Sequence, residues 1–186
     1  MTLQPSFFPD PASLPEGFLY QPNLISLDEE AALAAWIATL PLKPYEFRGY
    51  LGNRRIAAFG LGYGRTDQHA PGIPPILLEL RHKIARFAKH QPEDFIQTMA
   101  SEYAPGAGIG WHRDRPQFGE IVGVSLLADA RLRLRRKDGQ SWQRLSQLLE
   151  PRSAYLLSGD VRRNWEHSIP PQDRLRYSIT FRTATR

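Results

Sequence analysis

Two segments in the first half of the chain carry apolar residues at helical spacing. In SLDEEAALAAWIATLP, residues 26–41, Ser26 and Glu29 form a capping box and Pro41 ends the pattern. In PPILLELRHKIARFAKH, residues 74–90, prolines precede apolar residues that recur every three or four positions. The pattern therefore predicts two amphipathic helices.

Short β-prone segments dominate from residue 95 onward. Turn sequences such as KDG and SGD separate them at close intervals, which favours an antiparallel sandwich or barrel over βαβ units. We expect an α+β, mainly β fold in which two supporting helices precede a β-rich body. The predicted strands are residues 94–103, 120–128, 131–136, 143–149, 153–159 and 176–182.

The remaining regions divide the chain further. Residues 1–24 are rich in proline and predict an extended N-terminal arm, which leaves residues 25–186 as a single domain. Residues 45–72 are aromatic and Gly-rich and contain four arginines. They predict either a hairpin and loop over the core or a lid for substrate recognition, because aromatic and Arg groups together suit stacked bases and phosphates.

Composition narrows the class of protein. The length of 186 residues suits one domain. No apolar run approaches the roughly 18 residues of a transmembrane helix, and the N-terminus lacks a signal-peptide pattern. The chain has no cysteine, which excludes disulfides, thiolate nucleophiles and zinc–thiolate sites. We expect a cytoplasmic monomer without a membrane partner.

The charge of the chain favours acidic partners. The net charge is +5 with a pI of about 9.7, and nucleic acid is the first candidate. Only four of the 24 basic residues are lysines, so the arginine excess could also reflect genome base composition.

His112 and Asp114 lie two positions apart, after a Gly/Pro-rich turn and before an apolar strand. If this segment is extended, both side chains share a face. A His-x-Asp pair with one distant His is the facial triad of non-haem Fe(II) oxygenases. The pair is common by chance, so the prediction needs a third ligand. His167 is the best placed, because several strands bring the chain back before it, whereas His82 and His90 are expected to face solvent.

The last predicted strand, RYSITFR, adds an independent signal. Its alternation places Arg176, Ser178, Thr180 and Arg182 on one face. Two arginines on an inner face are costly unless they meet an anion. Guanidinium groups pair with carboxylates through two parallel hydrogen bonds, so a dicarboxylate co-substrate would fit. A solvent-facing polar side is the alternative.

The segments EYAPGAGIGWHRD and HSIPPQDRLRYSITFR resemble the AlkB family of Fe(II)- and 2-oxoglutarate-dependent dioxygenases, over about residues 45–184. The family's iron ligands match His112, Asp114 and His167. The resemblance implies a double-stranded β-helix, or jelly roll, with Fe(II), 2-oxoglutarate and O₂ as cofactors. It also implies oxidation of a substrate C–H bond, which on an N-methyl group releases formaldehyde.

The same resemblance assigns the co-substrate residues. The family's terminal motif Arg-x-Asn-x-Thr-x-Arg matches Arg176 and Arg182 here, with Ser178 in place of Asn. The family's Asn-x-Tyr, which contacts 2-oxoglutarate, appears as Ser101-Glu102-Tyr103. Two amides have thus become two serines, which suggests a compensating pair.

The best-known family members remove alkyl groups from bases in DNA or RNA, which requires flipping the base and stacking it on aromatic groups. Repair members often carry an acidic residue four positions after the first His ligand, and Pro116 stands there instead. Base selectivity would then come from elsewhere. The resemblance first implies oxidative dealkylation of alkylated bases in nucleic acid, as in DNA repair, and the alternative is a hydroxylase or demethylase that acts on RNA or protein. A non-catalytic, basic nucleic-acid-binding barrel remains a third reading. Residues available for stacking or for phosphates are Tyr45, Phe47, Tyr50, Phe59, Tyr63, Trp111, Arg54 and Arg55.

The stretch RLRLRRK places Arg131, Arg133 and Arg135 on one strand face and leucines on the other. Together with Arg136 these residues could follow a phosphate backbone. The face is either such a basic stripe or an ordinary solvated strand face, and the sequence favours neither.

Overall fold

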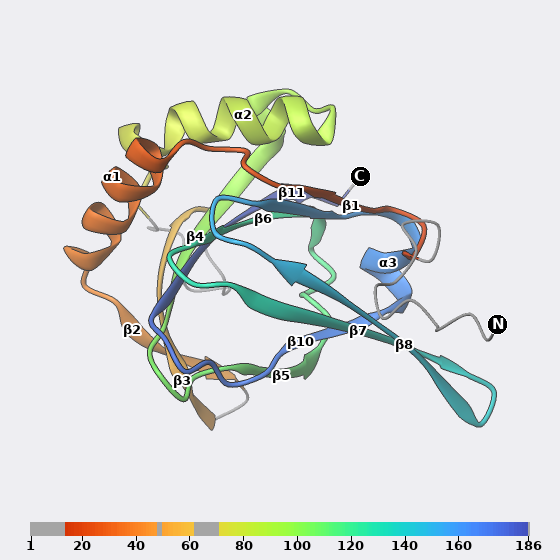
Figure 1. Ribbon diagram of the computed structural model, residues 1–186. Coiled ribbons are helices and arrows are strands. Elements are labelled where there is room, and N and C mark those ends of the chain that lie inside the picture. Colours follow the sequence, from red (N-terminus) through yellow and green to blue (C-terminus); the bar gives the residue numbers. More distant parts are fainter. Residues whose placement is uncertain (1–13, 48–49, 62–70, 186) are drawn as a thin grey trace, which may run out of the picture.

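The computed structural model describes residues 14–47, 50–61 and 71–185. These residues form two antiparallel sheets that pack face to face as a jelly roll (Figure 1). The larger sheet has the order β1-β9-β6-β11-β4-β3-β2 and the smaller one the order β5-β10-β7-β8. The strands are β1 (Phe18–Gln21), β2 (Lys43–Phe47), β3 (Tyr50–Gly60), β4 (Phe95–Tyr103), β5 (Ile109–His112), β6 (Phe118–Leu126), β7 (Ala130–Asp138), β8 (Ser141–Leu149), β9 (Ala154–Leu157), β10 (Glu166–Ile169) and β11 (Arg176–Ala184).

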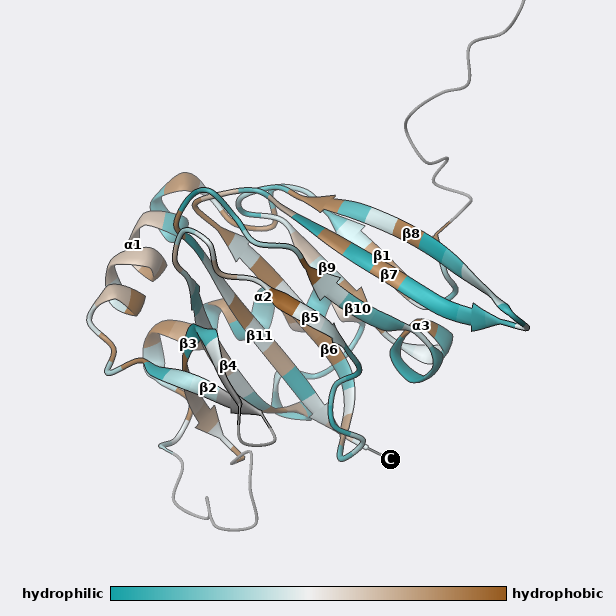
Figure 2. Ribbon diagram, turned by 90° about the horizontal axis from the view of Figure 1, so that it is seen from below, coloured by the Kyte–Doolittle hydropathy of each residue, from teal (hydrophilic) through white to brown (hydrophobic). Residues whose placement is uncertain are grey.

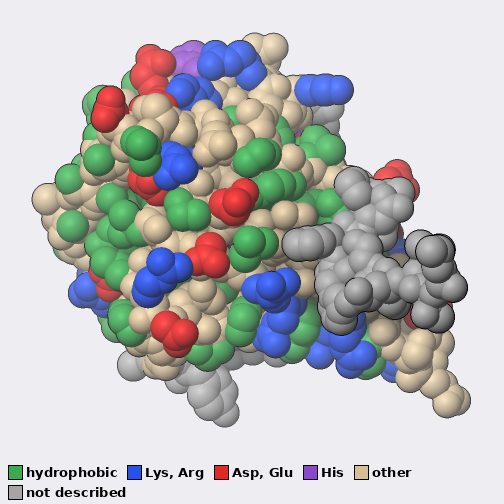
Figure 3. Space-filling model, viewed as in Figure 1, with side chains coloured by type: hydrophobic (Ala, Val, Ile, Leu, Met, Phe, Trp, Pro, Cys, Tyr) green, Lys and Arg blue, Asp and Glu red, His purple; other side chains and the backbone are tan. Residues whose placement is uncertain are grey.

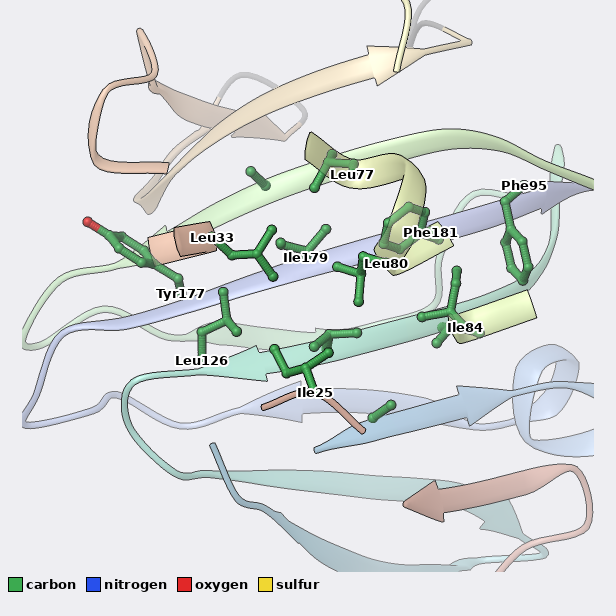
Figure 4. Close-up of a cluster of buried hydrophobic side chains, with 14 of the residues drawn as sticks. Ile25, Leu33, Leu77, Leu80, Ile84, Phe95, Leu126, Tyr177, Ile179 and Phe181 are labelled. Carbon is green, nitrogen blue, oxygen red and sulfur yellow. The ribbon is translucent and has the colours of Figure 1, made fainter. Parts of the chain in front are cut away.

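Helices α1 (Leu27–Ala38) and α2 (Leu78–Ala88) cover the outer face of the larger sheet (Figure 1). Their apolar stripes pack on the outward side chains of β4, β6, β9 and β11. Figure 4 shows Leu33 and Ile84 of the helices meeting Ile179 and Phe181 of β11. This packing buries one face of the central strand, so its other face is turned toward the smaller sheet.

A second apolar cluster fills part of the space between the sheets. It joins Ile121 and Leu157 of the larger sheet to Leu132 and Leu134 of the smaller one. The short helix α3 (Gly159–Asn164) and Trp165 add to it. The remaining space between the sheets is a cavity lined by both polar and apolar side chains, and it forms the candidate site.

Both predicted helices are confirmed, including the reciprocal capping box of Ser26 and Glu29. The first helix ends at Ala38, three residues before Pro41, and 3₁₀ turns η2 (Pro75–Leu77) and η3 (Pro92–Asp94) flank the second. The predicted strands are present, whereas α3, β5 and β10 were not predicted. No helix within the described ranges is long and apolar enough to cross a bilayer.

The domain begins before residue 25. Residues Phe18–Gln21, which fall in the predicted N-terminal arm, form β1 and pair with β9 at the edge of the larger sheet. The arm prediction is therefore wrong for this segment, and residues 1–13 lie outside the described part of the chain.

The region predicted as a lid is partly a hairpin, in which β2 pairs with β3 and β3 pairs with β4. Residues 48–49 and 62–70, and with them Tyr63, lie outside the described residues. The side chains of Phe47 and Tyr50 are likewise not described.

His90 differs from its predicted solvated position. Its Nδ1 lies 3.2 Å from Asp94 and its Nε2 2.8 Å from Glu120, and its side chain is only 15% exposed. Its ring also meets the edge of Phe95. His90 therefore links η3 and β6 to the end of α2, while His82 is exposed as expected.

Candidate active site

His112, Asp114 and His167 converge in the cavity between the two sheets. Their ligand atoms all lie within 4.8 Å of one another. His112 ends β5 and faces His167 of β10 directly in the strand register, with ring centroids 4.2 Å apart. Asp114 follows in the turn after β5, and its carboxylate lies 3.3 Å from His167 Nε2. The predicted triad is thus assembled by two adjacent strands and one turn.

The orientation of His112 suits a metal ligand. Its Nδ1 lies 2.9 Å from the carbonyl oxygen of Gly110, and because a carbonyl only accepts, Nδ1 must carry the proton. Nε2 is then left with a lone pair. Burial, followed by the neighbouring His167, lowers the pKa of His112 to about 4. The imidazole is therefore neutral, as a metal ligand must be.

Asp114 is held as a carboxylate. Burial alone would raise its pKa, but the Arg182 guanidinium and His167 outweigh burial and hold the pKa well below its ordinary value. Arg182 Nη2 lies 3.1 Å from Oδ1 of Asp114. The Arg182 guanidinium and the His167 imidazole thus flank a buried anion. Together His112, Asp114 and His167 form an N,N,O donor set of the kind that binds Fe(II).

A strongly positive pocket floor lies beside the triad. Arg176 is 1% exposed and donates from Nε to Ser125 Oγ at 3.1 Å. Tyr103 receives a hydrogen bond from Arg54 at 3.3 Å. Burial raises the pKa of Tyr103, but Arg54 and Arg176 more than offset this and lower it. The floor therefore attracts an anion.

Two buried polar atoms in this floor have no partner among the described residues. They are Nη1 of Arg176 and Oγ of Ser101, and both residues line the cavity. An unpaired guanidinium nitrogen in a buried site is costly unless an anion meets it. A carboxylate of 2-oxoglutarate bound here would satisfy both atoms, so the residues present fit the co-substrate.

Ser101 and Ser178 lie directly opposite each other in the register of β4 and β11. The next strand places Ser125 opposite Ser178. The two serines that replace the family's Asn residues are therefore neighbours, as expected of a compensating pair. Ser101 and Ser178 line the cavity, and Ser125 beside them accepts the hydrogen bond from Arg176.

Tyr155 of β9 was not predicted as a site residue, yet it lines the same cavity. Its ring lies over Gly123, where any added Cβ would overlap it. Burial raises the pKa of Tyr155, so its hydroxyl stays protonated. No described residue forms a hydrogen bond with this hydroxyl, which leaves it available to an anion in the pocket.

Arg162 holds the turn that carries Asp114. Its guanidinium donates to the backbone carbonyls of Arg115, Phe118 and Gly119 at 2.9, 2.6 and 2.7 Å. A single side chain of α3 thus satisfies several carbonyls of the loop after β5. Its position in a segment with no predicted structure hid this role from sequence reasoning.

The predicted substrate residues divide into two groups. Tyr45, Arg54 and Trp111 line the cavity, and the Arg54 guanidinium lies 4.2 Å from the Tyr45 ring centroid. Arg55 and Phe59 point to the opposite face of β3: Arg55 pairs with Glu102, and Phe59 packs on a tryptophan of α1. Neither side chain therefore lines the cavity, contrary to the expectation that both contact substrate there.

Pro116 does not line this cavity. It is exposed and lies in a neighbouring cleft, where its carbonyl accepts a hydrogen bond from Thr185. The position that carries an acid in repair members therefore contributes no side-chain acceptor to the pocket.

Comparison with known proteins agrees with this geometry. The chain matches the family described as the 2OG-Fe(II) oxygenase superfamily, where 2OG is 2-oxoglutarate, over residues 24–182. The mouse tRNA (carboxymethyluridine(34)-5-O)-methyltransferase ALKBH8 is 27% identical over 172 residues, covering 86% of this chain. The Xenopus tropicalis protein of the same name is 25% identical over 174 residues and also covers 86% of the chain. The chain spans 25% and 26% of the length of these relatives.

Solved structures support the fold. OsALKBH1 superposes with a TM-score of 0.66 at 15% identity, covering 91% of this chain and 99% of that one. A Pseudomonas putida prolyl-4-hydroxylase superposes with a TM-score of 0.62 at 18% identity, covering 91% and 93%. The predicted fold class, enzyme class and cofactors are thereby confirmed. The chain belongs to the 2OG-Fe(II) oxygenase superfamily and is an AlkB-like dioxygenase that uses Fe(II), 2-oxoglutarate and O₂.

Proposed function

We propose that this dioxygenase removes alkyl groups from bases in nucleic acid. The observation that carries the proposal is a single cavity of about 290 Å³ that holds the His112–Asp114–His167 triad and the Arg176 floor, with Tyr45, Arg54 and Trp111 also in its lining. Aromatic rings and guanidinium groups suit a flipped base and its phosphates.

His112, Asp114 and His167 would hold Fe(II), and the carboxylates of 2-oxoglutarate would pair with Arg176 and Arg182. Bound in this way, the metal and co-substrate supply an O₂-derived oxidation of a substrate C–H bond. An oxidised N-methyl group then loses formaldehyde and leaves the free amine.

The chain's own residues prepare the site. The Gly110 carbonyl fixes the His112 tautomer through Nδ1, which keeps Nε2 unprotonated. Arg182 orients the Asp114 carboxylate through two contacts, at 3.4 and 3.1 Å. Arg176 and Arg182 are each no more than 3% exposed, so their pairing with an anion is little weakened by water.

Nucleic acid is favoured over protein as the substrate class by charge. The chain carries a net charge of +5, and Arg113 and Arg115 join Arg54 in the cavity lining. The curated relatives are named for an activity on tRNA, which makes RNA as strong a candidate as DNA. The likeness to the prolyl hydroxylase extends to the fold alone.

The test is a substrate panel. The purified chain, supplied with Fe(II) and 2-oxoglutarate, is given methylated single-stranded DNA, methylated RNA, or a methylated peptide, each beside its unmethylated form. We expect a methylated oligonucleotide to stimulate succinate formation and to release formaldehyde. Stimulation by the peptide alone would contradict the proposal, and Asp114→Ala provides the inactive control.

A further inference from the structure

The smaller sheet turns a basic face to the outside, opposite to the side that carries His112 and His167. Leu132 and Leu134 of β7 are fully buried, so the alternate residues of this strand point outward. The helices α1 and α2 cover the larger sheet, and Figure 2 shows hydrophilic residues along β7 and β8 with no helix over them. We call this surface the Arg–Trp face. It consists of Trp111, Arg131, Arg133, Arg135, Lys137, Trp142 and Arg144.

The charges of the Arg–Trp face are unbalanced. Five of its residues are cations, while Glu166 is the single carboxylate at an outward position of these described strands, and it pairs with Arg135 at 2.7 Å. Arg144 and Lys137 are exposed and have no partner among the described residues. In Figure 3 basic side chains lie toward the lower right, where Figure 1 shows β7 and β8. An ordinary solvated strand face carries both positive and negative side chains. This face is mostly positive, so it is complementary to a polyanion.

Tryptophan rings hold the arginines of this face in fixed positions. The Arg135 guanidinium lies 4.3 Å from the ring centroids of both Trp111 and Trp142. Arg133 lies 5.1 Å from the Trp111 ring and donates to Ser168 at 3.0 Å. Stacked guanidinium groups are pre-oriented for phosphate oxygens. Trp142 remains 36% exposed, which leaves ring surface for a base to stack on.

The Arg–Trp face leads to the cavity. Trp111 immediately precedes the triad residue His112 on β5 and also lines the cavity. Successive cations of β7 lie two residues apart, about 6.7 Å along the strand, which is similar to the separation of phosphates in an extended single strand. A strand of nucleic acid lying on this face would therefore pass the mouth of the site.

We propose that the Arg–Trp face binds single-stranded nucleic acid and guides it to the cavity. The inference rests on the proposed function, for which it specifies a single-stranded substrate several nucleotides long. Arg136 is not part of this track, because it turns to Asp160 at 2.9 Å and stacks on Trp165.

The test uses the double variant Trp142→Ala/Arg144→Ala, since both side chains are exposed and their loss leaves the core intact. Binding of a labelled single strand of about 12 nucleotides is measured by fluorescence anisotropy at several salt concentrations. We expect affinity to fall about 5- to 150-fold and the salt slope to flatten by about 0.7 for the lost cation. Arg86→Ala, an exposed change on α2, is the matched control and should bind as the wild type does.

A conservative double variant tests whether the ring and the charge themselves are needed for binding. Trp142→Phe/Arg144→Lys keeps a ring and a charge and should recover most of the affinity. Melting temperature and Mn²⁺ binding verify that each variant is folded. In turnover assays the defect of the alanine variant should shrink as the methylated oligonucleotide is shortened below the length of the track.

Equal affinity and equal salt slope in wild type and alanine variant would overturn the inference. Equally tight binding of a duplex would overturn its single-stranded form. Binding that depends on Trp142 and Arg144 without any turnover of alkylated strands would support the face while contradicting the proposed function, so the two failures are distinguishable.

Discussion

Arg182 and Asp114 are in direct contact, with Arg182 Nη2 3.1 Å from Oδ1 of the carboxylate. The same guanidinium donates from Nη1 to Gln97 and to Thr180, and Thr180 lines the cavity. One side chain therefore links a proposed metal ligand to the proposed co-substrate site. Arg176, in contrast, has no contact with the triad among its described partners.

This difference separates the two arginines experimentally. Arg182→Lys should weaken binding of both Mn²⁺ and 2-oxoglutarate, because a charge-assisted contact of about 1.5–3 kcal/mol is lost at each. Arg176→Lys should weaken 2-oxoglutarate alone. Equilibrium dialysis of the metal and fluorescence titration of 2-oxoglutarate measure the two effects. Unchanged Mn²⁺ affinity in Arg182→Lys would show that its contact with Asp114 is not needed by the metal.

Alanine at His112, Asp114 or His167 should abolish turnover and reduce metal stoichiometry without unfolding the chain. Each removes one of three donors from the N,N,O set. The exposed His82→Ala on α2 is the control and should retain full metal content. Mass spectrometry measures the metal content of each variant, and full metal content in His167→Ala would disprove the triad.

Tyr155 and Gly123 form a second testable pair. Tyr155→Phe should weaken 2-oxoglutarate about tenfold, as expected for one hydrogen bond to a charged group. Gly123→Ala should destabilise the fold by about 1–3 kcal/mol, because the added methyl overlaps the Tyr155 ring. In the double variant Gly123→Ala/Tyr155→Ala the ring is absent, so chemical denaturation should show that Gly123→Ala costs less stability there than in the wild-type background. Strict additivity of the two single changes would contradict the overlap.

Arg162 should contribute stability that its neighbour Arg163 does not. Arg162→Gln leaves several carbonyls of the turn after Asp114 without their donor, and we expect a loss of about 2–3 kcal/mol together with weaker Mn²⁺ binding. Arg163→Gln, an exposed change on the same helix, should be nearly neutral. If both variants unfold at the same denaturant concentration, the turn is held by other contacts.

The metal-free protein should lose stability as pH falls from about 6.5 toward 4. Burial lowers the pKa of folded His112 from 6.5 to about 4. In this window the unfolded chain binds a proton at His112 that the folded chain does not, which favours unfolding. Urea unfolding of wild type and His112→Asn at several pH values measures how the free energy of unfolding changes with pH. The stability difference between them should shift against wild type on acidification, and a constant difference would contradict the lowered pKa.

The last strand and the triad could be predicted because alternation and motif order are local properties of the sequence. RYSITFR places Arg176 and Arg182 inward and Tyr177 and Phe181 outward, as its pattern indicates. The pairing of Ser101 with Ser178 could also be expected from the sequence, because both serines replace family Asn residues of one pocket, which suggests that they are neighbours.

The residues missed or misplaced depend on register. Arg54 and Arg55 are adjacent, and only the pairing of β3 with β4 decides that Arg54 faces the cavity and Arg55 faces Glu102. Tyr155 lies in a uniformly buried strand, where no alternation marks the inward side. Arg162 acts on backbone carbonyls, which leave no trace in side-chain patterns.

Whether this chain dealkylates nucleic acid is best decided by a single-turnover reaction. The protein is loaded with Fe(II) and 2-oxoglutarate without oxygen, then mixed with O₂ and a methylated single-stranded oligonucleotide, and succinate and formaldehyde are counted. We expect close to one formaldehyde for each succinate, and neither product with Asp114→Ala. Succinate that forms at the same slow rate with or without the oligonucleotide, and with no formaldehyde, would contradict nucleic-acid dealkylation.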